Sequence, residues 1–314
     1  MSLLGLWPLM SGCERGISPL RVATNPWIGY EFMFLARREN WISVQDIVLV
    51  EAGSATGALD LLAAGKADGA ALTLDEVLRG RERGLALTAV LVFDVSLGAD
   101  VLLAKPGIDA LARLKHKRIG FEPSGVGALM LTKALEAAGL RTSDVTAVPT
   151  KFDQHEKVWR AGDIDALITF EPAASRLEAE GALRLFDSSK IPDTVIDVLA
   201  VTPTAADRHH EALHSLVEAH FRALAHFRQN PYDAAHRMAE HLKMSPKQVM
   251  GAFKGLELPN ESRNRKLLRG NESSLVKTAQ ELGAVMVQAG LLKNGQTDVS
   301  RLVSADFLPR VETK

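Results

Sequence analysis

The most recognisable group of chemically capable residues is a His-Glu-x-x-His pattern formed by His210, Glu211 and His214. On a helix this spacing places two imidazoles one turn apart, and in zinc peptidases the glutamate acts as a general base. The longer zinc-binding pattern needs a glycine where Val217 stands, and helical periodicity turns His220 away from His214. We therefore expect histidines at the edge of a core-facing stripe, with a zinc peptidase as the less favoured alternative and no metal site.

A second group of candidates is acidic. Asp75, Asp94 and Glu171 lie at or just after apolar runs, without an obvious Lys or Arg partner. Carboxylates that line a cleft in this way favour an ammonium or amidine group, or N–H donors of a ring. The structural alternative is that Asp75 caps its own helix and that Glu171 begins the next one.

Two loops rich in glycine and serine, at residues 53–57 and 123–127, each join an expected strand to an expected helix. Glycine permits close backbone approach, and the first N–H groups of a helix favour an anionic group. Such residues can equally be simple helix caps. Two facing loops of this kind would suit a carboxylate, sulfonate or phosphate. The candidate contacts are Ser54, Ala55, Ser124, Gly125 and Val126.

Aromatic residues follow the first expected strand. Trp27, Gly29 and Tyr30 come shortly after the run Leu20 to Thr24. An aromatic side chain in a cleft offers an apolar wall, or stacks on a planar or cationic group. The alternative is that Trp27 packs on a neighbouring helix. Together with the acids and helix starts, this favours a zwitterion or polar heterocycle as ligand.

Composition excludes other classes of protein. The chain has 314 residues, 46% of them hydrophobic, which is enough for two cores. Its 37 basic and 38 acidic residues are interspersed, so no nucleic-acid partner is expected. No apolar stretch reaches the roughly 18–20 residues that span a bilayer.

The candidate residues need a scaffold, and the sequence alternates short apolar runs with helical stretches. Strands are expected at 20–24, 47–51, 67–73, 101–104 and 118–121, among others, and almost only helices after residue 205. Strands separated by helices predict mostly parallel sheets in an α/β fold.

An internal similarity divides the chain. Residues 64–70 resemble residues 161–167, and each stretch continues to a threonine and an acid: Thr73 with Asp75, and Thr169 with Glu171. Ligands bind beyond the carboxyl ends of strands in open α/β sheets. We therefore expect two related lobes whose acidic loops face one cleft.

Several segments, in this order, resemble the nitrate/sulfonate/taurine-type solute-binding proteins of ABC transporters and their relatives that bind thiamine-pyrimidine precursors. They are residues 25–31, 93–100 with Ser96, 114–120, 162–172 with Phe170 and Glu171, and 290–309. The resemblance implies a two-lobed periplasmic-binding-protein fold with two crossovers. Lobe one would comprise residues 20–106 plus 203–314, and lobe two residues 107–202.

The resemblance also implies a function. The chain would be the solute-binding component of an ABC-type uptake system that closes on a small polar or zwitterionic solute, sulfonate-, nitrate- or pyrimidine-like. Its partners would be a permease and its ATPase, and we expect a monomer without a cofactor. The competing hypothesis is an enzyme on the same fold, similar to those of a menaquinone pathway. Seven of the nine histidines fall between residues 209 and 241, outside the expected cleft, which disfavours it.

The N-terminal 19 residues resemble a shortened secretion signal. Cys13 ends a short apolar run with small residues before it, as in the lipobox of bacterial lipoproteins, although no basic residue precedes the run. We expect a residual lipoprotein tail with lipidation at Cys13, and thus a periplasmic or cell-surface location. The alternative is a tail with an incidental cysteine.

Overall fold

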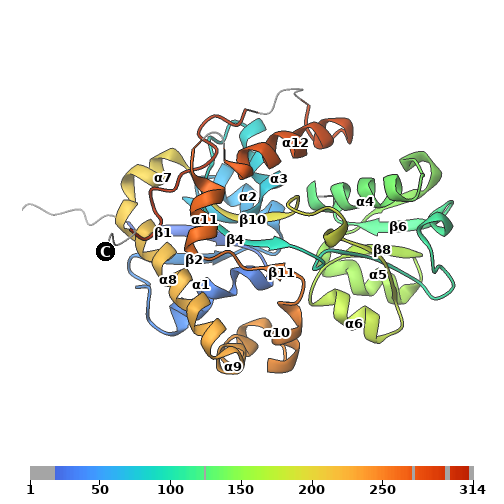
Figure 1. Cartoon of the computed structure of the whole chain (residues 1–314), viewed down its shortest axis with the longest axis horizontal. Helices are drawn as coiled ribbons and strands as arrows, with labels where there is room; N and C mark the ends of the chain where they lie inside the picture. The colour runs from blue at the N-terminus through green and yellow to red at the C-terminus, as the bar shows by residue number, and fades with distance from the viewer. Residues whose placement is uncertain (1–17, 124, 271–272, 294–297, 311–314) are drawn as a thin grey trace, which may run out of the picture.

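The computed structural model describes residues 18–123, 125–270, 273–293 and 298–310. Its strands form two separate sheets, and helices lie on both faces of each sheet (Figure 1). One sheet has six strands in the order β11-β4-β10-β3-β1-β2, and the other has five in the order β7-β6-β8-β5-β9. We call the parts built on these sheets the large lobe and the small lobe. This arrangement confirms the predicted two-lobed α/β fold.

The large lobe contains strands β1 (Leu20–Thr24), β2 (Ile47–Glu51), β3 (Gly69–Thr73), β4 (Thr88–Ser96), β10 (Ile196–Val201) and β11 (Leu256–Glu257). Its helices are η1 (Ile28–Tyr30), α1 (Glu31–Arg38), α2 (Ala55–Ala63), α3 (Leu74–Glu82), α7 (Pro203–Arg208), α8 (His210–Gln229), α9 (Pro231–Leu242), α10 (Pro246–Ala252), α11 (Glu261–Leu268) and α12 (Ser274–Gln288). The small lobe contains β5 (Val101–Ala104), β6 (Arg118–Phe121), β7 (Thr146–Pro149), β8 (Ala166–Thr169), β9 (Leu183–Asp187), α4 (Gly125–Ala137), α5 (His155–Ala161) and α6 (Ala173–Ala179). Short 3-10 turns are η2 (Leu111–Leu114), η3 (Thr142–Asp144), η4 (Phe152–Gln154) and η5 (Ser188–Lys190).

Each sheet contains both parallel and antiparallel pairs of strands. In the large lobe β1 pairs in parallel with β2 and β3, whereas β10 is antiparallel to both β3 and β4. In the small lobe β6 is parallel to β7 and β8, and β5 is antiparallel to β8 and β9. Every residue of β10 is buried, as expected for a strand covered by helices on both faces.

Sheet membership corrects the predicted lobe boundaries. Strand β5 lies in the small-lobe sheet and β10 in the large-lobe sheet. The chain therefore changes lobe between residues 96 and 101 and again between 187 and 196, not at 106/107 and 202/203. The two crossing segments lie together, because the Ser96 and Ser188 hydroxyls are hydrogen-bonded at 2.7 Å and Gly98 N donates to Ser188 Oγ. The local pattern predicts a strand but not the sheet that it joins.

A pair of matching ion pairs supports the internal similarity. In the large lobe Asp68 accepts hydrogen bonds from the backbone N and the guanidinium of Arg21. In the small lobe Asp165 accepts the same set from Arg118. Both pairs are 47 residues apart, and both join the starts of neighbouring parallel strands. We call these two contacts the Arg–Asp clasps. They occupy equivalent places in two related lobes.

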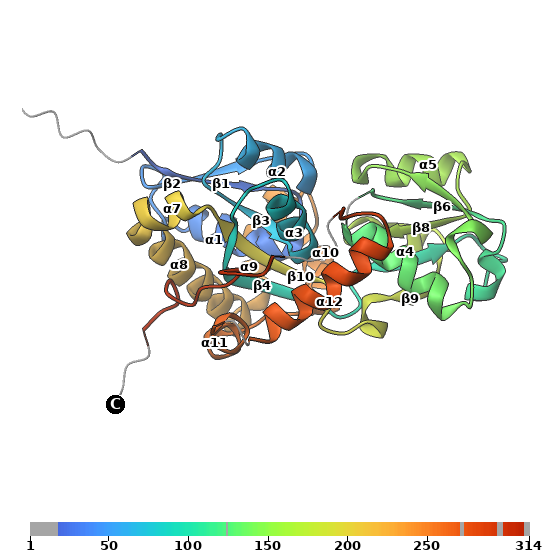
Figure 2. The ribbon, with the colours of Figure 1, turned by 90° about the horizontal axis from the view of Figure 1, so that it is seen from above.

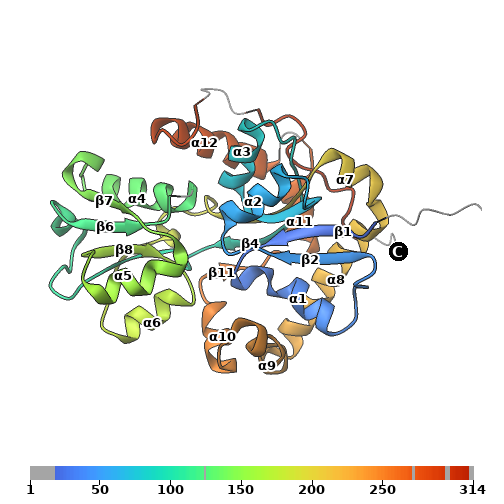
Figure 3. The same ribbon diagram turned by 180° about the vertical axis from the view of Figure 1, so that it is seen from behind.

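The lobes also touch away from the crossing segments. Helix α12 reaches from the large lobe to α4 of the small lobe, as the views from above and from behind show (Figures 2 and 3). Leu129 of α4 is 1% exposed and packs with the large-lobe core. Helix α4 of the small lobe is therefore packed against the large lobe.

Candidate functional site

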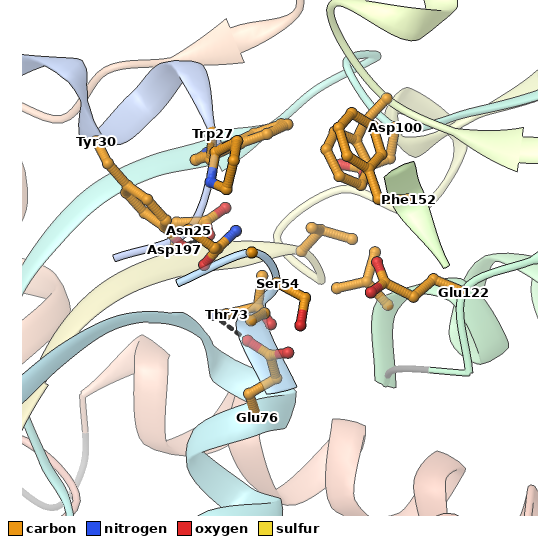
Figure 4. Close-up of a pocket in the computed structure, with 16 residues that line it drawn as sticks. Asn25, Trp27, Tyr30, Ser54, Thr73, Glu76, Asp100, Glu122, Phe152 and Asp197 are labelled. Atoms are coloured by element: carbon orange, nitrogen blue, oxygen red, sulfur yellow. Dashed lines mark hydrogen bonds between the residues drawn. The ribbon is translucent and has the colours of Figure 1, made fainter. Parts of the chain in front are cut away.

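A pocket with a cavity volume of about 60 Å³ lies between the lobes, at the carboxyl ends of their parallel strands. Loops after β1, β2 and β3 form one side, and loops after β6, β7 and β8 form the other (Figure 4). The start of β10 closes the bottom of the pocket. This is the location expected for a ligand site in open α/β sheets. The lining residues are Asn25, Pro26, Trp27, Tyr30, Gly53, Ser54, Ala55, Thr73, Glu76, Asp100, Glu122, Val126, Phe152, Phe170, Val195 and Asp197.

Half of the predicted ligand-binding residues line this pocket. They are Trp27, Tyr30, Ser54, Ala55, Thr73, Val126 and Phe170. Ser54 is the N-cap of α2, and its hydroxyl accepts a hydrogen bond from Gly57 N at 3.2 Å. The first turn of α2 therefore faces the pocket as predicted, although the Ser54 hydroxyl already has a partner.

Trp27, Gly29 and Asp94 form one packed unit beside the pocket. The indole Nε1 of Trp27 donates to Asp94 Oδ2 at 3.1 Å. A Cβ atom on Gly29 would lie 1.8 Å from that oxygen and 2.8 Å from Nε1, so only glycine leaves room for the bond. Burial raises the pKa of Asp94 to about 7, although the Trp27 hydrogen bond opposes the shift. Asp94 and Gly29 thus set the orientation of Trp27 and are not lining residues themselves.

Tyr30 and Asp197 form a second buried pair on the floor of the pocket. The Tyr30 hydroxyl donates to Asp197 Oδ1 at 2.5 Å. In the sheet, Asp197 stands directly between Asp94 on β4 and Thr73 on β3. Burial and the nearby charge of Asp94 raise the pKa of Asp197 well above its usual range. Two acids face each other across neighbouring strands, which is costly unless a proton or a cation separates them.

Three more carboxylates line the pocket. Burial, with the neighbouring charges of Asp75 and Glu122, raises the pKa of Glu76 to about 8. Burial likewise raises the pKa of Asp100 to about 6. Burial and the charge of Asp75 raise the pKa of Glu122. Among the described residues that line the pocket, none is Lys, Arg or His. The pocket therefore gathers carboxyl groups whose protonated forms burial favours, with no cationic side chain among its described lining residues.

Several buried oxygens around the cleft have no hydrogen-bond partner among the described residues. Two of those that line the pocket are Asn25 Oδ1 and Asp100 Oδ2. Buried polar atoms in native proteins are nearly always paired. These groups can accept hydrogen bonds, so the arrangement calls for a ligand or water that donates them.

The small lobe contributes an aromatic wall. Phe152 and Phe170 stack face to face, with ring centroids 4.2 Å apart and planes 5° apart. Phe170 also meets Trp27 of the large lobe edge-on at 5.3 Å. Aromatic faces attract planar groups and cations. The wall spans the gap between the lobes, so a solute beside it would touch both.

Besides Gly29 and Asp94, four predicted site residues lie outside the pocket lining: Asp75, Ser96, Gly125 and Glu171. Ser96 belongs to the crossing segments, and both oxygens of Glu171 accept from Ser175 at the start of α6. Asp75 packs against Gly125 across the lobes. Ser96 and Glu171 are thus held by nearby protein groups, whereas Asp75 Oδ2 has no hydrogen-bond partner among the described residues. Ser124 and Cys13 lie outside the described residues.

The sequence prediction missed Asp197, Glu76, Asp100, Glu122, Phe152, Asn25, Pro26, Gly53 and Val195. Some adjoined residues already singled out, such as Glu76 beside Asp75. Asp197 had a detectable sign, because it is the single acid within an otherwise apolar strand. Phe152 and Glu122 carried no such sign. They reach the pocket only because the small lobe folds against the large one.

The His-Glu-x-x-His residues lie on and near the surface of α8. Glu211 is fully exposed, and His214 is within 3.6 Å of Glu218 on the next turn. His220 is fully buried among the rings of Phe32, Phe93 and Phe221. In the described part of the chain, no three His, Cys, Asp or Glu side chains are arranged to hold a metal ion. Nor is any helix of this part long and apolar enough to cross a membrane.

Comparison with known proteins gives a family match and many matches of fold. A family model described as NMT1/THI5 like matches residues 33–234. No curated protein matches the sequence. Among solved structures, the periplasmic aliphatic sulphonate-binding protein SsuA from Escherichia coli is 17% identical with a TM-score of 0.76, over 92% of this chain and 99% of that one.

Two further structures share the fold. The ligand-binding component of an ABC-type import system from Staphylococcus aureus, with zinc bound, is 14% identical with a TM-score of 0.75, over 92% of this chain and 97% of that one. The desulfurization enzyme DSZB is 17% identical with a TM-score of 0.66, over 92% and 97%. At these identities the likeness shows the fold alone, and the fold serves both binding proteins and an enzyme.

Proposed function

We propose that this chain, which belongs to the NMT1/THI5-like family, is the solute-binding component of an ABC-type uptake system. Its solute would be small and would carry a positively charged or N–H-rich group, as in an amine-bearing zwitterion or an aminated heterocycle. One observation carries the proposal. The interlobe pocket is lined by four carboxylates and by aromatic rings, with no cationic side chain among the described lining residues.

Electrostatics favours such a solute over a nitrate-like anion. An anion in this pocket would approach Glu76, Asp100, Glu122 and Asp197 in a partly desolvated space. Each of these acids that is ionised repels the anion strongly, because little water remains to screen the charges. A cation or an N–H donor instead relieves the repulsion among the carboxylates and supplies partners for the unpaired oxygens.

The mechanism follows from contacts on both lobes. A solute held between the carboxylates of the large lobe and the ring of Phe170 contacts the closed form more than the open form. Ligand therefore shifts the population toward closure by its difference in affinity for the two states. The closed protein would then dock on a permease with its ATPase, at a periplasmic or cell-surface location. SsuA from Escherichia coli, whose fold is similar, is described as periplasmic.

Calorimetric titration of the purified protein tests the ligand class. The panel would contain benzamidine, tetramethylammonium, 4-aminopyrimidine, taurine, methanesulfonate and nitrate. We expect binding by at least one solute with an amine, amidine or ring N–H group, and none by nitrate. Binding by inorganic anions alone would overturn the proposal.

The alternative function is that of an enzyme on the same fold. The desulfurization enzyme DSZB, whose fold is similar, is an example of such an enzyme. Within the described lining the hydroxyl of Ser54 already caps α2, and no cysteine, lysine or histidine lines the pocket. A raised-pKa acid such as Glu76 could still transfer a proton. Mass spectrometry of each bound solute after prolonged incubation separates the two functions, since a binding protein returns its ligand unchanged.

A further inference from the structure

Asp75 of the large lobe lies against the first residue of a small-lobe helix. It is the second residue of α3, and α4 begins at Gly125 across the cleft. Helices α3 and α12 of the large lobe both contact α4. A Cβ atom on Gly125 would lie 1.5 Å from Asp75 Oδ2 and 2.2 Å from its Cγ. The carboxylate therefore occupies the space that a side chain at residue 125 would fill.

This carboxylate is buried and incompletely paired. Asp75 is 2% exposed, and its Oδ2 has no hydrogen-bond partner among the described residues. It does not line the pocket described above. Its unpaired oxygen instead faces the start of α4, a helix of 13 residues.

The start of α4 is a natural place for negative charge. The first N–H groups of a helix lack partners within the helix, and the helix dipole adds positive potential there. Asp75 also stands in the first turn of its own helix α3. One carboxylate therefore lies at the positive ends of two helices, the geometry in which proteins bind phosphate, sulfate or sulfonate groups.

We propose that Asp75 is a resident anion that determines the specificity of the cleft. It occupies the position at which α4 would take the anionic group of a solute, and so it excludes free anions from the helix start. The same contact helps to hold the small lobe closed on the large one. This inference rests on the proposed function, because it assumes that the cleft admits a solute.

Neighbouring charges reinforce the exclusion. Glu76 follows Asp75 in α3, and Glu122 lies just before α4. The charge of Asp75 raises the pKa of both groups, so all three lie close enough to interact. Burial raises the pKa of Asp75, whereas a hydrogen bond with Thr73 and the charge of Arg79, one turn further along α3, oppose the shift and favour the carboxylate. An anion that displaced Asp75 would face the other two carboxylates.

Replacement of Asp75 by alanine removes both the charge and the volume that block the start of α4. We expect Asp75→Ala to bind methanesulfonate or sulfate at least about tenfold more tightly than the parent protein in calorimetry, since a charge-assisted contact typically contributes that much. Asp75→Asn keeps the volume and should gain less. Asp60→Asn, on the exposed face of α2, is the matched control and should gain nothing. Equal anion affinity in Asp75→Ala and the parent would overturn the inference.

A second variant tests the contact even if Asp75→Ala folds poorly. Gly125→Ala places a methyl group on the carboxylate, so Asp75 and the start of α4 must move apart. Small-angle scattering of the ligand-free protein should give a larger radius of gyration for Gly125→Ala than for the parent, and an unchanged radius counts against the inference. The proposed function fails separately: in that case the parent protein binds no amine-bearing solute, whatever the variants do with anions.

Discussion

The two lobes share a scaffold but differ in what their cleft loops do. The Arg–Asp clasps hold equivalent strands with the same hydrogen bonds in each lobe. After β3, the large lobe places Glu76 in the pocket, where its carboxylate accepts a long hydrogen bond from Thr73 N, at 3.3 Å, as part of a capping box. After the equivalent β8, the small lobe places Glu171, whose two oxygens are both occupied by Ser175.

In the repeat the counterpart of Glu171 is Asp75, so the acids that follow the two equivalent strands differ both in position and in partner. An acid whose oxygens are held by a helix start stabilises that helix and has little capacity left for a ligand. An acid that is buried and underpaired has a raised pKa and attracts a cation. The large lobe thus supplies most of the polar contacts, and the small lobe supplies the aromatic wall.

The sharpest test of the comparison exchanges one acid in each lobe for its amide. Glu76→Gln should weaken binding of an amine-bearing solute by about 10- to 100-fold, because a charge-assisted hydrogen bond typically contributes about 1.5–3 kcal/mol. Glu171→Gln should leave the affinity within about twofold, because this substitution weakens only the hydrogen bonds between Glu171 and Ser175 at the start of α6. Calorimetry with the same solute measures both. Equal losses in the two variants would break the comparison.

Removal of the small-lobe ring should have the next largest effect. Phe170→Ala loses the stack with Phe152 and the edge contact with Trp27. We expect an affinity loss of about 5- to 30-fold, as aromatic and cation–π contacts contribute about 1–2 kcal/mol. Fluorescence of Trp27 should also respond less to ligand. An affinity equal to that of the parent protein would mean that the wall does not touch the solute.

The acids of the large lobe predict a dependence on pH. The folded-state pKa values of Glu76 and Asp94 are about 8 and about 7, above those of the unfolded chain. Their protonated forms are favoured in the folded state, so this stabilisation is present at low pH and is lost as pH rises through 7 and 8. Burial lowers the pKa values of His155 and His220. These two histidines make the folded state more stable as pH rises, but only below about pH 6.5, the ordinary pKa of histidine.

Between pH 7 and 8.5 the melting temperature of the empty protein should therefore fall, while affinity for a cation rises as the acids ionise. Thermal unfolding and calorimetry across this interval measure the two trends. Glu76→Gln removes one of the titrating groups and should flatten both curves. A melting temperature that increases over this interval is incompatible with buried, protonated acids.

The smallest expected effect concerns the shared scaffold. Asp68→Asn and Asp165→Asn each weaken one clasp, and both sites are partly exposed. Each variant should lose about 1 kcal/mol of unfolding free energy in urea titration, since net hydrogen-bond contributions are of that size. Solute affinity should stay unchanged in both. Very different losses would show that the two clasps, although alike in geometry, are not equivalent in energy.

The sequence alone predicted most of the scaffold. Strands β1, β2, β5 and β6 occupy the predicted ranges, because an apolar run bounded by turn residues is a local pattern. The similarity of residues 64–70 and 161–167 predicted related lobes, and both stretches lead into the clasps. Loops after strands could be named as ligand contacts, since that rule depends only on the order of elements.

Tertiary structure decided the rest. The sheet that β5 or β10 joins depends on pairing between distant segments, so the lobe boundaries could not be read locally. Tyr30 and Asp197 are 167 residues apart in sequence, and nothing near either residue shows that they meet. Whether an acid is free for a ligand depends on burial and on its partners, as Glu171 and Glu76 demonstrate. Chain order determined where candidate residues stand, and only packing determined which of them remain without a partner.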